Sequence, residues 1–143
     1  MEKRILVPVD GSDQAVAASE YVVENFPSAT VVLLHVINPA EAGYTAEASM
    51  PTVSEEWYDE KRAHAKELFD DLEASAHEAG VEDVERVLEV GRPTQAIVDY
   101  ADDHDIDQIV MGSHGRSGMS RILLGSVAEI VVRRATVPVT VIR

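Results

Sequence analysis

The 143-residue sequence contains no cysteine, so disulfide bonds, thiolate nucleophiles and cysteine-based metal sites are excluded. Basic residues are also few: 12 Lys and Arg stand against 26 Asp and Glu, which gives a formal net charge of −14. A surface of that sign repels phosphate backbones and anionic lipids. We therefore expect neither nucleic acid nor a membrane as a partner.

Long apolar runs are missing near the N-terminus, where the first run extends only from Ile5 to Val9. Such a run is too short for a membrane span or a signal peptide, so we expect a cytoplasmic protein. Lysine is scarce as well, with 3 Lys against 9 Arg. This acidic composition resembles that of proteins that stay soluble at high salt, where ions screen the repulsion between carboxylates, and it favours a saline cytoplasm.

The length and the 45% hydrophobic content fit one domain with one buried core, spanning residues 1–143. Apolar runs alternate with amphipathic helical patterns, which is typical of an α/β domain with a parallel sheet. The expected strands are Ile5–Val9, Val31–Ile37, Val84–Val90, Ile109–Met111 and Val137–Ile142, and the expected helices are Ser12–Phe26, Ser54–Ala79, Pro93–His104 and Ser126–Ala135.

The composition of the strands predicts their order. The first two runs are almost continuously apolar, as expected of strands covered on both faces. The third run carries three charges and the fifth contains Pro138, so both belong at the edges. Right-handed crossovers then give an open, flavodoxin-like or Rossmann-like five-stranded sheet of order 3-2-1-4-5 with helices on both faces. Ligands of such sheets bind at the switch point, here at the ends of strands 1 and 4, where Asp10 and Gly112 lie.

A glycine pattern, G-x2-G-x9-G-S, follows the fourth strand and is formed by Gly112, Gly115, Gly125 and Ser126. Glycines let backbone N–H groups approach an anion, and a helix N-terminus adds the positive end of its dipole. Ser126 also stands three residues before Glu129, as in a capping box, so we expect it to cap the last helix. A Ser hydroxyl and the N–H groups at a helix start serve a bound phosphate equally well, so we expect that role too. The pattern favours a phosphate-bearing ligand, with a plain tight connection as the alternative.

The charge distribution supports the phosphate hypothesis. Residues 108–128 contain no Asp or Glu, and their formal charges are Arg116 and Arg121. Arg116 is suited to a bidentate contact with a phosphate, whereas His114 either donates to a phosphate or braces the loop. The other histidines lack metal-binding spacing, so no metal site made by the protein alone is expected.

Five segments in order, VPVDGS, LLHV, GRP, MGSHGRSG and LLGSVAE, carry a resemblance that runs from Ile5 to Ile142. With them the chain resembles the universal stress protein family, and its glycine spacing matches the ATP-binding branch. The resemblance implies a homodimer that pairs its last strands and binds ATP, or another adenine nucleotide, with Mg²⁺ or Mn²⁺ on the phosphates. The ATP-binding residues that it implies are Pro8, Val9, Asp10, Val36, Met111, Gly112, Ser113, His114, Gly115, Arg116, Ser117, Gly118, Gly125, Ser126, Val127 and Ala128.

Within that set, the resemblance implies that Asp10 contacts adenosine and that Val36 presents its backbone to the adenine edge. Gly112–Gly118 would wrap the ribose and phosphates, and Ser126–Ala128 would hold the β and γ phosphates. The residues themselves leave alternatives open, namely an Asx turn for Asp10 and a core strand position for Val36. The irregular segment Asn38–Val53 either covers the ligand or is a surface excursion.

The last strand presents Val137, Val139 and Val141 without a lysine to block pairing. Such an edge aggregates unless it is paired or covered, so we expect it to pair with a second copy, with cover by another part of the chain as the alternative.

The resemblance implies an ATP-binding regulatory protein of the stress response, with slow or no ATP hydrolysis and an unknown protein partner. The Gly-Lys pair of a Walker A loop is absent, and the sequence positions no second acid near Asp10, so no catalytic residue is assigned. The alternatives are a weak ATPase that acts as an enzyme and a dimeric scaffold with a vestigial site.

Overall fold

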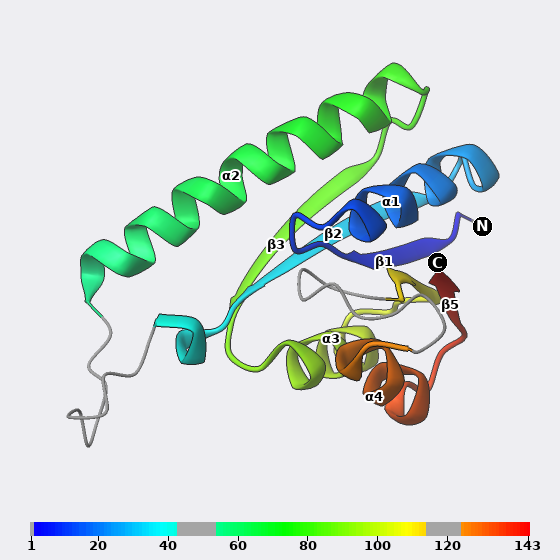
Figure 1. The fold of residues 1–143 in the computed structure, drawn as a ribbon. Coiled ribbons are helices and arrows are strands. Elements are labelled where there is room, and N and C mark those ends of the chain that lie inside the picture. The colour runs from blue at the N-terminus through cyan, green and yellow to red at the C-terminus, as the bar shows by residue number, and fades with distance from the viewer. Residues whose placement is uncertain (1, 43–53, 114–123) are drawn as a thin grey trace.

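Strands and helices alternate along the chain in the computed structural model, which describes residues 2–42, 54–113 and 124–143 (Figure 1). The strands are β1 (Arg4–Pro8), β2 (Thr30–Ile37), β3 (Val84–Val90), β4 (Gln108–Gly112) and β5 (Val139–Ile142). The helices are α1 (Asp13–Asn25), α2 (Glu55–Glu78), α3 (Pro93–Asp103) and α4 (Ser126–Arg134), with a 3-10 helix η1 (Pro39–Ala42) after β2.

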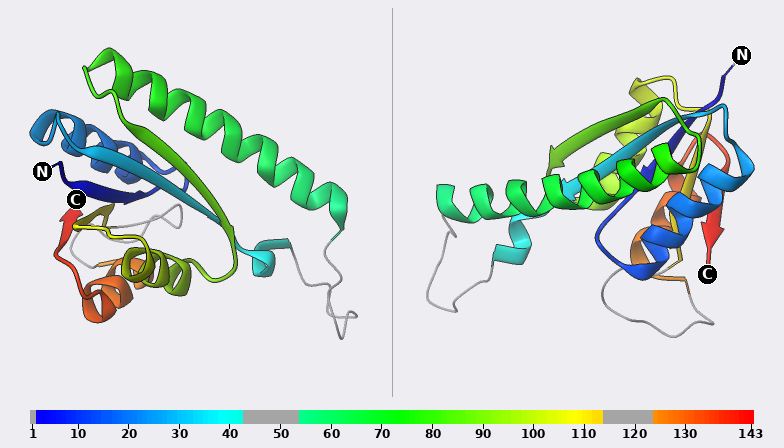
Figure 2. Two further views of the ribbon diagram at one scale, coloured as in Figure 1. Left: turned by 180° about the vertical axis from the view of Figure 1, so that it is seen from behind. Right: turned by 90° about the horizontal axis from the view of Figure 1, so that it is seen from above.

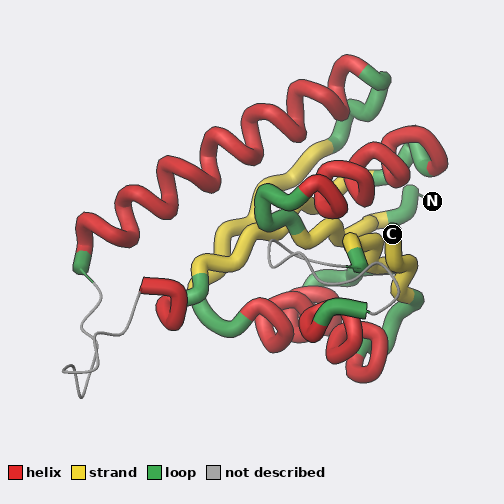
Figure 3. Tube along the Cα trace, in the orientation of Figure 1, coloured by secondary structure: helices red, strands yellow, loops and turns green. Residues whose placement is uncertain are grey.

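The strands form one parallel sheet of order β3-β2-β1-β4-β5, so the predicted fold class and strand order are confirmed (Figure 3). The two edge strands are β3, which carries charges, and β5, which directly follows Pro138. In the centre, Leu6 of β1 is in register with Val32 of β2 on one side and with Ile109 of β4 on the other. The carboxyl ends of β1 and β4 therefore meet at the switch point.

Two layers of helices cover the sheet, α1 and α2 on one face and α3 and α4 on the other (Figure 2). Because side chains alternate along a strand, Ile5 and Val7 pack under α1 and α2, whereas Leu6 packs under α3 and α4. All three are 0% exposed. This two-sided burial explains why β1 and β2 are apolar almost throughout.

Local signals set most helix boundaries as predicted. The hydroxyl of Ser12 accepts the Ala15 N–H at 3.2 Å and caps α1, and that of Ser54 caps α2 in the same way. Gly80 follows α2 with a φ of +98°, a conformation that other residues adopt only with strain. Pro93 occupies the first turn of α3, where its missing N–H costs nothing.

Two local predictions are wrong. Ser126 is the first helical residue of α4, and the N-cap is Gly125, so the expected capping box does not form. The last strand begins at Val139, so Val137 lies before it. Val137 instead packs against the core under α3 and α4, a contact made with residues distant in sequence.

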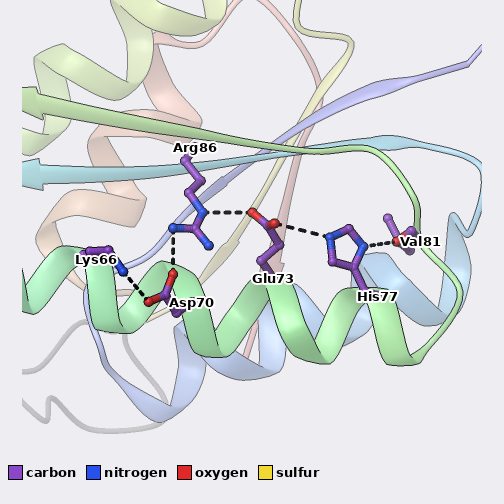
Figure 4. A network of polar contacts seen from close by, with 6 residues as sticks. All are labelled: Lys66, Asp70, Glu73, His77, Val81 and Arg86. Carbon is purple, nitrogen blue, oxygen red and sulfur yellow. Dashed lines mark hydrogen bonds and ion pairs between the residues drawn. The ribbon is translucent and has the colours of Figure 1, made fainter.

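An ion-pair network joins the outer edge strand to α2 (Figure 4). Arg86 of β3 contacts Glu73 through Nε and Asp70 through Nη1, both at 2.8 Å. Lys66 also contacts Asp70, at 2.9 Å. The Arg86 guanidinium holds the pKa of Glu73 below its ordinary value. Arg86, one of the three charged residues that mark β3 as an edge strand in the sequence, thus also links this strand to α2.

His77 extends this network to the end of α2. Its Nδ1 donates to the Val81 carbonyl oxygen at 2.8 Å, and its Nε2 lies 3.3 Å from the Glu73 carboxylate. Both partners accept, so the two bonds form together only when the imidazole is protonated. The Val81 carbonyl, and then Glu73, raise the pKa of His77 above its ordinary value.

The raised pKa makes the stabilising effect of His77 dependent on pH. The effect is fully present below the ordinary histidine pKa and is lost as the pH rises through the higher folded-state pKa. We expect His77→Gln to lower the melting temperature more at about pH 5 than at about pH 9. Thermal denaturation followed by circular dichroism measures the difference, and an equal effect at both pH values would contradict this assignment.

Candidate functional site

A cavity of about 450 Å³ opens at the carboxyl ends of the central strands, where the topology places the switch point. It is bounded by the ends of β1, β2 and β4 and by the first turns of α1, α3 and α4. All eleven predicted site residues that the structure describes line it: Pro8, Val9, Asp10, Val36, Met111, Gly112, Ser113, Gly125, Ser126, Val127 and Ala128. The structure thus brings four separate segments of the sequence to one cavity.

The other five predicted site residues lie outside the described residues. They are His114, Gly115, Arg116, Ser117 and Gly118, which form the central part of the glycine pattern. Their roles stay predictions.

Asp10 ends the first segment and makes the Asx turn that the sequence left open. Its Oδ1 accepts the Ser12 N–H at 2.9 Å, which shapes the turn into α1. Asp10 lines the cavity as well. The local turn and a contact with a ligand are therefore compatible, because the turn uses one of the two carboxylate oxygens.

Gly112, at the end of β4, is required by packing against α1. A Cβ atom at this position would lie 2.6 Å from the Cβ of Gln14 and 2.9 Å from the Gln14 carbonyl carbon. These distances are shorter than real contacts allow. The glycine of the motif thus lets α1 approach the end of β4, in addition to any role toward an anion.

The segments before and after the undescribed part of the glycine pattern are tied together by their backbones. Ser113 donates its N–H to the Ile142 carbonyl oxygen at 2.7 Å, and its own carbonyl accepts the Gly125 N–H at 2.7 Å. The N–H of Gly125 is therefore engaged within the protein. This N–H group is therefore not one of the donors that the site offers to an anion.

The first turn of α4 presents backbone donors at the cavity that have no acceptor among the residues that the structure describes. The first intrahelical bond runs from the Glu129 N–H to the Gly125 carbonyl at 3.0 Å, so the N–H groups of Ser126, Val127 and Ala128 lie before it. Gly125 has no side chain that accepts from them. Together with the helix dipole, these donors form a site suited to an anion.

Further lining residues were not predicted from the sequence. They are Ser12, Ala15, Leu34, His35, Glu41, Pro93 and Ile97. The LLHV and GRP segments contain three of them, but their side chains match no ligand pattern, so their types give no signal of a site. Glu41 belongs to η1, inside the segment 38–53 that the sequence predicts either to cover the ligand or to be a surface excursion.

A second cavity of about 250 Å³ lies beside the first, against α2. The two cavities share Asp10, His35, Val36 and Glu41, which form the boundary between them. Across residues 2–42, 54–113 and 124–143, no cluster of three or more His, Asp or Glu side chains is arranged to hold a metal ion. No helix in these ranges is long and apolar enough to cross a membrane.

The chain is similar in sequence and in structure to known proteins. The universal stress protein MJ0531 of Methanocaldococcus jannaschii is 35% identical over 144 residues, covering 99% of this chain and 82% of its own. The structure of MJ0577 from the same organism superposes with a TM-score of 0.84 at 33% identity, covering 99% of this chain and 96% of its own.

A third relative has been solved with a bound nucleotide. The universal stress protein of Archaeoglobus fulgidus, solved in complex with dAMP, is 25% identical with a TM-score of 0.68 and covers 100% of this chain and 98% of its own. The sequence matches the universal stress protein family over residues 1–143. The chain belongs to the universal stress protein family.

Proposed function

We propose that the larger cavity binds an adenine nucleotide, with its phosphates at the first turn of α4 and its sugar beside Asp10. The observation that carries the proposal is the set of N–H donors of Ser126–Ala128, which have no acceptor among the described residues, at a cavity of nucleotide size. Asp10 lines the cavity as well, and a carboxylate accepts hydrogen bonds from hydroxyl or amino groups. The N–H donors of α4 suit the phosphates of a nucleotide, and the Asp10 carboxylate suits its hydroxyl-bearing sugar.

The proposal that the base is adenine rests on the family relationship. The dAMP bound to the Archaeoglobus relative supports an adenine nucleotide as the ligand class. Val36, at the end of β2 and on the cavity wall, is placed to offer backbone groups to the base. The residues present thus fit the ligand, and a Mg²⁺ or Mn²⁺ ion on its phosphates belongs to the same proposal.

ATP is the proposed physiological ligand, and the proposed role is regulatory, with slow or no hydrolysis, so that occupancy of the site changes the interaction with a partner protein. Isothermal titration calorimetry with ATP, ADP, AMP and GTP in the presence of Mg²⁺ tests the ligand. Tight binding of ATP with rejection of GTP is the expected result. Absence of adenine-nucleotide binding to the folded protein would refute the proposal.

Dimerisation through β5 is part of the same proposal. In the described structure, β5 pairs with β4 along one side and is the last strand of the sheet, with Val139 and Val141 only half-buried. Pairing with a second copy would satisfy the backbone groups on its outer side. Light scattering after gel filtration measures the mass, and a monomer at micromolar concentration would contradict this part.

A further inference from the structure

The imidazole of His35 links β2 to the residue that precedes Asp10. Its Nδ1 lies 2.7 Å from the Val9 carbonyl oxygen. A carbonyl oxygen only accepts, so Nδ1 carries the proton and donates. The Val9 N–H in turn donates to the Leu34 carbonyl oxygen at 2.9 Å. Both polar backbone groups of Val9 are therefore held by β2.

The His35 ring is itself held from α2. Phe69, which is 4% exposed, contacts it edge to face, with ring centroids 6.5 Å apart and an interplanar angle of 88°. A donor whose orientation is already restricted loses little conformational entropy when it forms its bond. The bond from His35 to Val9 is thus built on a packed support and not on a mobile side chain.

Asp10 lies between two such restraints. His35 holds the carbonyl group of the peptide that joins Val9 to Asp10, and the Ser12 N–H holds Oδ1 of Asp10 at 2.9 Å. Both Asp10 and His35 line the two cavities. The restraints therefore act on the carboxylate at the boundary where a ligand would contact it.

We infer that His35 is a positioning residue: through the Val9 carbonyl it holds the Asp10 carboxylate in the orientation that accepts a hydroxyl group of a sugar-bearing ligand. The part that concerns the ligand rests on the proposed nucleotide site. The part that concerns the turn is a property of the protein alone. Loss of the donor would leave the Val9 carbonyl without its partner and release the turn that carries Asp10.

Three substitutions separate this role from a direct contact of His35 with the ligand. His35→Phe keeps an aromatic ring beside Phe69 and removes the donor. His35→Asn keeps an N–H near the position of Nδ1, whereas His35→Gln places an N–H near the position of Nε2. His64→Phe is the matched control, because His64 lines only the second of the two cavities.

Calorimetry with ATP reports on the ligand. We expect the affinity to fall about tenfold in His35→Phe and His35→Gln, as for the loss of one hydrogen bond, and to stay within about twofold of the original in His35→Asn. The control His64→Phe should bind ATP as the unaltered protein does. Rescue by His35→Gln in place of His35→Asn would overturn the inference, because it would assign the effect to Nε2.

Hydrogen exchange of the Ser12 amide tests the turn without any ligand. We expect faster exchange in His35→Phe and His35→Gln and unchanged exchange in His35→Asn, with circular dichroism confirming that each variant is folded. Unchanged exchange in a folded His35→Phe variant would overturn the inference. If the unaltered protein bound no nucleotide, the proposed function would fail, while the Ser12 amide would still decide the positioning role.

Discussion

Gly112→Ala lowers the free energy of unfolding by about 2–3 kcal/mol, the upper part of the range of about 1–3 kcal/mol expected when a well-packed contact is overfilled. The new Cβ would meet Cβ and the carbonyl carbon of Gln14 at 2.6 and 2.9 Å. One of these atoms is backbone in the first turn of α1, so a change of rotamer cannot relieve the contact. Either α1 or the end of β4 must move. Urea denaturation followed by circular dichroism measures the loss.

Gly80→Ala is the control for the general effect of replacing a glycine. Gly80 has a φ of +98°, and a Cβ there meets no atom within 4 Å. Its replacement costs only the strain of the backbone conformation, about 1 kcal/mol. Gln14→Gly removes the closest of the contacts, the one with the Gln14 Cβ. The loss caused by Gly112→Ala should therefore be smaller when it is measured in the Gln14→Gly background. A Gly112→Ala variant as stable as Gly80→Ala would contradict the packing role.

Ser126→Asp reduces the affinity for ATP about 30-fold to 100-fold, which corresponds to about 2–3 kcal/mol. The added carboxylate stands in the first turn of α4, beside the N–H donors proposed to bind phosphate, and it repels the phosphate charges. The same charge interacts favourably with the helix dipole, by about 0.3–1 kcal/mol, so the fold should be no less stable. Binding and stability are thus expected to change in opposite directions.

Two comparisons separate the effect of the added charge from the effect of the changed side-chain shape. Ser126→Asn has nearly the same shape without the charge and should retain most of the affinity for ATP. Adenosine, which has no phosphate, should bind Ser126→Asp as it binds the unaltered protein. Calorimetry measures the affinities and thermal denaturation the stability. Equal ATP affinity of the Asp and Asn variants would place the phosphates elsewhere in the cavity.

The sequence by itself determined the features that depend on neighbours along the chain. Alternating apolar runs and helical patterns predict the parallel sheet, and the charges of Val84–Val90 together with Pro138 predict its edges. Ser12 and Gly80 mark helix ends through hydrogen bonds and backbone angles within a few residues. Once the order of the strands is known, the topology places Asp10 and Gly112 next to each other at the carboxyl ends of the neighbouring strands β1 and β4.

The tertiary structure alone decided which atoms these residues use. Gly112 must be glycine because Gln14 lies against it, and the N–H of Gly125 is engaged by Ser113 instead of being left for an anion. His35 acquires its partner from Val9, the residue that follows β1 and lies 26 positions earlier in the chain. Such contacts depend on how separate elements dock, which hydrophobic periodicity does not encode. A motif therefore locates a site, whereas the packing around it determines which of its groups remain available to a ligand.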